Sequence, residues 1–196
     1  MPAPRLFLRR CATLAIAALL SVPAQADPGG FARTLPSPDT VQRIASDRTT
    51  LAPFSYILFC QRHPGDCQGG ARTAIDWDLQ ARLGVAWINL WVNHLMRPQH
   101  DGTDVWDAGL AAGDCEDFAL TKRQILIRAG LPAASLQMAV ARTRSGEGHA
   151  VLVLRTSDGD LVLDNRNDQL SEWHHTDLTW LKIASAENPR IWYAIN

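Results

Sequence analysis

The sequence lacks an excess of basic residues. Its 196 residues contain 19 lysines and arginines against 20 aspartates and glutamates, a formal net charge of -1 at pH 7. No basic stripe is available to neutralise phosphates, so the composition argues against a nucleic-acid-binding protein. Internal repeats are also lacking, and 46% of the residues are apolar, as in ordinary globular proteins. This length and composition predict one domain with its own core.

Long apolar runs are equally rare. The only one, Cys11 to Val22, has about a dozen residues, short of the roughly 20 that span a bilayer. A basic stretch precedes this run, at Arg5, Arg9 and Arg10, and the small-x-small cleavage site Ala24-Gln25-Ala26 follows it. We therefore predict a cleaved signal peptide over residues 1–26, a single domain over residues 27–196 and a periplasmic or secreted location. An uncleaved membrane anchor is the alternative.

Cysteine is scarce as well. Cleavage after Ala26 removes three arginines and Cys11, which leaves 16 basic and 20 acidic residues, a net charge of -4 and three cysteines. In an oxidising compartment, Cys60 and Cys67 are close enough in sequence to pair across a small loop. This pairing leaves Cys115 as an odd thiol.

Local patterns predict helices in the first part of the chain and strands in the second. We expect a short helix from Ser37 to about Arg48, a disulfide-stapled irregular segment from Leu51 to Cys67, a long helix from Thr73 to Pro98, a loop from Gln99 to Gly113, and a helix from Cys115 to Ala129. Strands are expected at Leu136 to Arg142, His149 to Leu154, Leu161 to Asp164, Thr179 to Ala184 and Arg190 to Ile195. This order favours an α+β domain with an antiparallel sheet.

Cys115 lies where a glycine-containing loop becomes a helix. Backbone N–H groups and the positive end of the helix dipole lower the pKa of a thiol in that position, and the thiolate is the nucleophile. The neighbouring acids oppose this effect if their side chains point the same way. The alternative for a lone cysteine is a small buried apolar residue.

His149 and Asp164 complete a set of residues for nucleophilic catalysis. A thiolate needs an imidazole to exchange a proton and a third group to orient that imidazole. In a hairpin with a four-residue loop, His149 faces Asp164. A tight turn centred on Asp158-Gly159 is the stronger hairpin signal, and it places Asp164 opposite Val153, about 13 Å from His149. The triad therefore requires the looser register, and an ordinary strand-end histidine is the alternative.

Three motifs occur in the order Cys, His, Asp: Gly-Asp-Cys-Glu-Asp-Phe-Ala-Leu-x-Lys-Arg at 113–123, His-Ala-Val-Leu at 149–152 and Leu-Val-Leu-Asp-Asn at 161–165. Together they resemble the bacterial transglutaminase-like cysteine proteinases of the papain/transglutaminase superfamily. The resemblance extends to Asn89 and Asn93, to Asp104-Val105-Trp106 and to the Phe59-Cys60…Cys67 segment, so that it covers about residues 53 to 195. It implies an α+β, papain/transglutaminase-like fold in which N-terminal helices, with the nucleophile at a helix start, pack on an antiparallel sheet.

The resemblance also implies a function. Cys115 is the expected nucleophile, His149 the general base and acid, and Asp164 the orienting carboxylate of a peptidase that acts through a thioester. The best-understood members, the LapG-type proteases, are periplasmic and cleave surface adhesins to release biofilm cells. They depend on calcium held by acidic residues beside the cysteine, here Asp114 and Glu116. The expected partners are a protein substrate such as an adhesin and an inner-membrane regulatory receptor, and no organic cofactor is expected.

Several alternatives stay open. The acyl group can pass to an amine, as in transglutaminases, or the domain can be a non-catalytic, calcium-binding interaction module of the envelope. Glu116 can simply favour a helix N-terminus electrostatically. The oxyanion donors are expected to be the Cys115 backbone N–H and the indole of Trp106, for which core packing is the alternative.

Two further pairs carry no expected chemistry. His174-His175 lies in a polar segment without a third ligand at metal spacing, so we expect it to face solvent. Lys122 and Arg123 are expected on a solvated face of the helix that begins at Cys115.

Overall fold

A seven-stranded antiparallel sheet forms the framework of the computed structural model, which describes residues 41–71, 73–100, 102 and 104–195. Its strands are β1 (Ser46–Thr50), β4 (Leu136–Arg142), β5 (Gly148–Thr156), β6 (Gly159–Leu163), β7 (Ser171–Glu172), β8 (Thr179–Ala184) and β9 (Trp192–Ile195). They are arranged in the order β1-β9-β8-β4-β5-β6-β7. The described residues belong to one compact unit.

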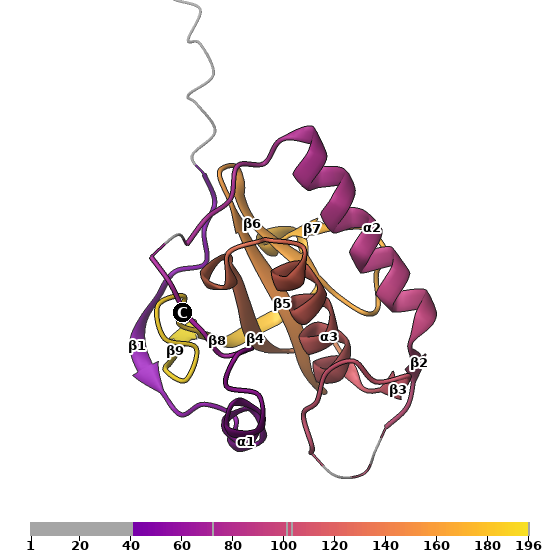
Figure 1. Cartoon of the computed structure of the whole chain (residues 1–196). Helices are drawn as coiled ribbons and strands as arrows, with labels where there is room; N and C mark the ends of the chain where they lie inside the picture. The colour runs from indigo at the N-terminus through magenta and orange to yellow at the C-terminus, as the bar shows by residue number, and fades with distance from the viewer. Residues whose placement is uncertain (1–40, 72, 101, 103, 196) are drawn as a thin grey trace, which may run out of the picture. The chain divides into compact units, whose positions relative to one another are not determined.

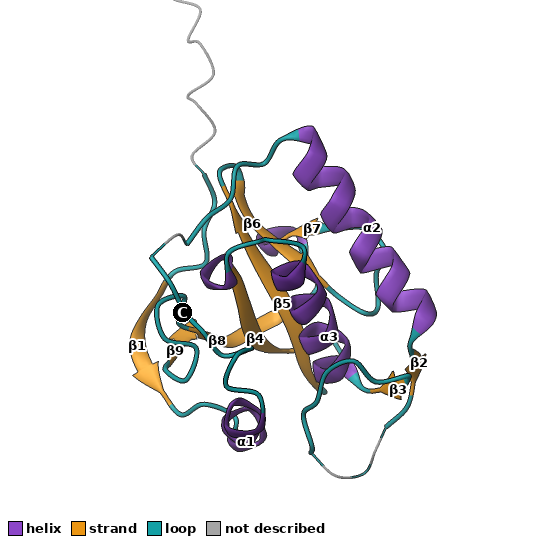
Figure 2. Cartoon of the chain, in the orientation of Figure 1, coloured by secondary structure: helices purple, strands orange, loops and turns teal. Residues whose placement is uncertain are grey.

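The helices that cover this sheet are α1 (Phe54–Arg62), α2 (Leu79–Leu95) and α3 (Cys115–Arg128). Shorter elements are the 3-10 turns η1 (Ala133–Ser135) and η2 (Trp173–His175) and the parallel pair β2 (Arg97–Pro98) and β3 (Ala112–Gly113). Figure 2 shows α3 lying across the sheet, with α2 beside it. The α+β, transglutaminase-like architecture is therefore confirmed. Within the described residues, no helix has both the length and the apolar character needed to cross a bilayer.

The central strand β5 is buried on both of its faces. Ala150, Leu152 and Leu154 join the core shared with the helices, whereas Val151 and Val153 join a second core on the opposite face. A strand covered on both sides has an almost continuous apolar sequence, which explains why 150–154 contains no polar residue. β5 is thus a rigid support for the residues at its beginning.

The structure differs from the sequence-based expectation before residue 68. The helix predicted from Ser37 to about Arg48 is wrong in its described part, because Ser46–Thr50 is strand β1 (residues 37–40 lie outside the described residues). The reason is tertiary: the Ile44 amide donates to Asp160 at 2.9 Å, and Arg43 forms an ion pair with Asp160 at 3.1 Å. The segment 51–67 is not wholly irregular either, since α1 occupies its middle, just after Pro53 and just before Pro64.

The long helix begins later than predicted. Asp78 is the N-cap of α2 and accepts a hydrogen bond from the Ala81 amide at 2.8 Å. Ile75, which lies within the range predicted for the helix, instead forms an isolated bridge with Thr156 of β5. The helix ends at Leu95, before Pro98, as expected.

The apolar face of α2 is divided between the core and the surface. The side chains that it buries include Val85, Ile88 and Val92. Other large apolar side chains of this helix stay exposed, among them Leu79, Leu83, Leu90 and Trp91. The apolar character of a residue in α2 therefore does not indicate whether the residue is buried.

Several local expectations are confirmed. α3 begins at Cys115 and ends at Arg128, followed by Gly130 with a φ of 99°, and β4 and β8 have the predicted limits. Cys60 and Cys67 form the expected disulfide, and Cys115 is a free thiol.

Candidate active site

The start of α3 is fixed by Asp117. One carboxylate oxygen of this buried residue accepts the Asp107 amide at 2.8 Å, and the other accepts the Asp114 amide at 3.3 Å. Gly113 is required beneath it, because a Cβ at this position would lie 2.3 Å from the Asp117 carboxylate. These contacts join the preceding loop to the first turn of α3 and set the position of Cys115. Asp117 is thereby a structural acid of the first turn.

The Cys115 thiol is half-buried and contacts both the sheet and its own helix. Its Sγ accepts a hydrogen bond from the Ala150 amide of β5 at 3.4 Å and lies 3.1 Å from Oε2 of Glu116. The pKa of Cys115 is raised to about 12, mainly by burial and to a smaller extent by Glu116 and Asp114, whereas the hydrogen bond from the Ala150 N–H acts in the opposite direction. The expectation that the helix start lowers this pKa is therefore wrong for this structure, first because the thiol is largely buried and second because the Glu116 side chain points toward the sulfur.

His149 and Asp164 are brought together. Nε2 of His149 lies 2.9 Å from Oδ1 of Asp164, and both residues are buried. The register is neither of the two considered from the sequence: Thr156 pairs with Gly159 and Leu152 with Leu163. β6 ends one residue before Asp164, so the His–Asp contact is diagonal rather than direct. The inference that the contact requires a four-residue loop is wrong, since diagonal side chains can reach one another.

Arg166 supports Asp164 from the loop that follows β6. Its backbone N–H donates to Oδ1 of Asp164 at 2.9 Å, and its guanidinium joins Asp164 and Asp177 at 2.9 and 2.8 Å. Burial alone would raise the pKa of Asp164, but hydrogen bonds from His149 and Arg166 hold the pKa well below its usual range. Asp164 is therefore kept ionised beside His149. Arg166 was not among the residues predicted from the sequence, although its position two residues after Asp164 is a signal that the sequence contains.

Two asparagines of α2 hold the same loop from the other side. Nδ2 of Asn89 donates to the carbonyl oxygens of Asn167 and Asp168, at 3.0 and 2.9 Å. Nδ2 of Asn93 donates to the carbonyl of Asp164 at 3.1 Å. The two asparagines included in the family resemblance thus fix the backbone that carries Asp164.

A cleft of about 800 Å³ opens at Cys115 and His149. Its walls come from the segment after β2, the start of α3 and the beginning of β5, and they include His100, Asp104, Trp106, Glu147 and Arg166. Trp106 is buried, and its indole N–H donates to Asp104 at 2.8 Å. That N–H is engaged in this structure, so the oxyanion role of Trp106 stays a prediction and core packing is its observed contribution.

Asp114 and Glu116 bring two carboxylates to the rim of this cleft. Burial, together with a hydrogen bond with Asp114, raises the pKa of Glu116 to about 8. Oδ1 of Asp114 is buried and accepts no hydrogen bond from the described residues. An unused buried oxygen beside a second carboxylate is a donor set that suits calcium, a cation that prefers oxygen ligands.

Lys122 and Arg123 are buried, so the solvated face expected for them is wrong. Arg123 donates to the backbone carbonyls of Asp66, Ala133 and Leu136, which ties α3 to the loop after α1 and to the start of β4. Lys122 is fully buried, and its Nζ makes no hydrogen bond to the described residues. Burial lowers the pKa of Lys122 to about 7, against the opposing effect of Asp164 and Asp168.

Helices packed on an antiparallel sheet, with a thiol at the start of the central helix and a hydrogen-bonded His–Asp pair beside it, define a transglutaminase-like cysteine peptidase. The sequence model of the bacterial transglutaminase-like cysteine proteinases (BTLCP) matches residues 46–196, and the chain belongs to this family. The family assignment made from the three motifs is thereby confirmed.

Comparison with solved structures shows the same fold. Calcium-bound LapG of Legionella pneumophila is 24% identical, with a TM-score of 0.52, over 58% of this chain and 69% of that chain. EGTA-treated LapG of the same organism is 23% identical, with a TM-score of 0.50, over 59% and 68% of the two chains. A comparison with curated proteins finds no match.

Proposed function

We propose that this cysteine peptidase acts through a triad of Cys115, His149 and Asp164. The observation that carries the proposal is the 2.9 Å contact between Nε2 of His149 and Oδ1 of Asp164, in the cleft that Cys115 also lines. Because Nε2 is directed to Asp164, Nδ1 of His149 is left to exchange a proton with the thiol. The Ala150 amide, 3.4 Å from Sγ, places the sulfur beside the same stretch of β5.

The reaction then has two steps. Cys115 gives its proton to His149, its sulfur bonds to the carbonyl carbon of a peptide, and His149 returns the proton to the amine that leaves as the C–N bond breaks. Water next gives a proton to His149 and attacks the thioester, which releases the acid and restores the thiol. The first backbone N–H groups of α3 have no acceptor within the helix, so the Cys115 N–H is a suitable oxyanion donor.

Calcium is part of this proposal. Asp114 and Glu116 would hold the ion, and the unpartnered Oδ1 of Asp114 supports their assignment. A bound calcium ion would supply positive charge beside the two carboxylates that disfavour the Cys115 thiolate. The relative described as calcium-bound LapG also supports this choice of metal.

The proposed substrate is a protein of the bacterial envelope or surface, such as an adhesin, and an inner-membrane receptor is the proposed regulator. The resemblance to the LapG-type proteases supports both assignments. The leader predicted over residues 1–26 and the disulfide between Cys60 and Cys67 support export, since disulfides persist in oxidising compartments.

Alkylation followed by mass spectrometry, together with envelope proteomics, tests the proposal. In the folded wild type, Cys115 is expected to be the alkylated residue, and EGTA is expected to slow its labelling. Envelopes from wild-type cells are expected to contain new protein termini that are absent with Cys115→Ala or His149→Ala, whereas His174→Ala, in η2 and outside the cleft, retains them. An unreactive Cys115 with calcium present, or the same termini in all strains, would contradict the proposal. Adding a primary amine to a peptide substrate distinguishes hydrolysis from amine transfer.

A further inference from the structure

A second group of ligating side chains lies away from the thiol, at the far edge of the sheet. Glu172 ends β7, and His174 and His175 belong to the 3-10 turn η2 that follows. Among the described residues, these three form the one group of His, Cys, Asp and Glu whose ligating atoms all lie within 4.8 Å of one another. No third ligand for His174 and His175 was expected from the spacing of residues in the sequence. In the structure Glu172 supplies it, since its carboxylate lies next to the imidazoles two and three positions further along the chain.

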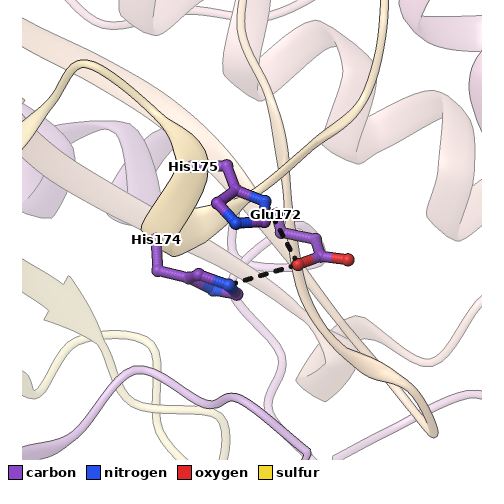
Figure 3. Close-up of side chains that lie close together, drawn as sticks. All are labelled: Glu172, His174 and His175. Carbon is purple, nitrogen blue, oxygen red and sulfur yellow. Dashed lines mark ion pairs between the residues drawn. The ribbon is translucent and has the colours of Figure 1, made fainter. Parts of the chain in front are cut away.

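We propose that Glu172, His174 and His175 bind a divalent transition metal ion of the zinc type. Figure 3 shows both imidazoles directed at the same carboxylate. Oε2 of Glu172 lies 3.2 Å from Nε2 of His174 and 3.4 Å from Nδ1 of His175. Ligands at about 2.0–2.1 Å from a tetrahedral zinc ion are roughly 3.3 Å from each other, so these separations already match two edges of such a site.

The backbone that carries the three ligands is held in place. Glu172 pairs with Leu161 of β6, which fixes the end of β7. The carbonyl of Trp173 accepts hydrogen bonds from Oγ1 of Thr176 at 2.8 Å and from the Trp180 indole at 3.3 Å. Ligands on a fixed turn lose little freedom when a metal binds, which favours binding.

The chemistry of the donors selects the metal. Two imidazoles and one carboxylate suit zinc, copper or nickel, whereas calcium prefers an all-oxygen set such as Asp114 and Glu116. The side chains are also accessible, with exposed fractions of 31% for His174, 56% for Glu172 and 69% for His175. Three protein ligands leave a fourth position for water.

Zinc titration against a chromogenic chelator tests this site. The parent protein for the titration is the whole chain without the predicted leader, with the substitution Cys115→Ser so that the thiol does not bind zinc. The buffer contains calcium throughout. We expect one zinc ion per chain, an affinity at least about tenfold lower for Glu172→Gln, and loss of binding for the double variant His174→Ala/His175→Ala. The matched control is His94→Ala, because His94 pairs with Asp168 at 2.8 Å on the surface without a second histidine. This control is expected to bind zinc as the parent does.

Glu172→Gln keeps the shape of the side chain, and circular dichroism verifies that each variant is folded. Failure of the parent to bind zinc, or equal affinity of the double variant and the parent, would overturn the proposal. The test is independent of peptidase activity, which the Cys115→Ser background removes.

Discussion

Replacing Lys122 by methionine is expected to stabilise the fold at neutral pH. Lys122 is fully buried, and burial lowers its pKa from 10.5 to about 7. In the unfolded chain the lysine stays protonated up to about pH 10, so between pH 7 and 10 the unfolded state binds more protons and stability rises with pH. The shift corresponds to a destabilisation of about 4 kcal/mol at pH 7 that falls to about 1 kcal/mol at pH 9.5. Methionine fills a similar volume without a charge.

Urea unfolding followed by circular dichroism measures this difference at both pH values, in a Cys115→Ser background that removes the titrating thiol. Lys182→Met is the control, because Lys182 is only partly buried and its Nζ donates to the Leu51 carbonyl at 3.0 Å. We expect the advantage of Lys122→Met to shrink as the pH rises; burial also lowers the pKa of Lys182, but this side chain is only partly buried, so the effect of Lys182→Met should change less. An advantage that is absent at pH 7, or that is equal at pH 7 and 9.5, would refute the reasoning.

Three other perturbations have defined outcomes. Replacing Cys60 and Cys67 by serine opens a loop with a sequence separation of 7, which should lower the free energy of unfolding by about 2–3 kcal/mol in urea titrations; an unchanged midpoint would contradict this. Arg166→Gln removes guanidinium donors that hold the pKa of Asp164 down. The ionised Asp164 contributes stability that is present above the pKa of this carboxyl group in the unfolded chain and is lost as the pH falls through its pKa in the folded chain. Without the guanidinium donors the folded-state pKa is higher, so acid unfolding of Arg166→Gln should occur at higher pH than that of the wild type. An identical acid transition would contradict this prediction. Asn93→Ala frees the Asp164 carbonyl and should lower kcat on the order of tenfold or more with little change in KM, whereas a change in KM alone would show that Asn93 does not position the triad.

Local signals predicted the central helix and most of the sheet. The limits of α3 follow from a first-turn acid at Asp117 and from Gly130 after its end, and both signals lie within a few residues of the helix. The first part of the chain could not be predicted in this way. Its strand β1 depends on β9, and the Ile44 amide depends on Asp160, 116 residues away.

The candidate site shows the same division. The three residues of the expected triad were identifiable from their order and motifs, but the diagonal contact of His149 with Asp164 depends on a hairpin register that the turn residues left open. Arg166 and the burial of Lys122 depend on how the loop after β6 packs against α2 and α3. No periodicity within α3 distinguishes a buried lysine from an exposed one.

The pairing of β1 with β9 joins the earliest described strand to the last one, with Ser46 opposite Ile195. During synthesis, β1 leaves the ribosome long before its partner exists, so the outer part of the sheet can close only after β9 has also been synthesised. Such a distant pairing slows folding, because a long loop must close before the contact forms. A product that stops before β9 would leave the edges of β8 and β1 open to pairing with other chains, which makes the absence of this one strand a source of aggregation.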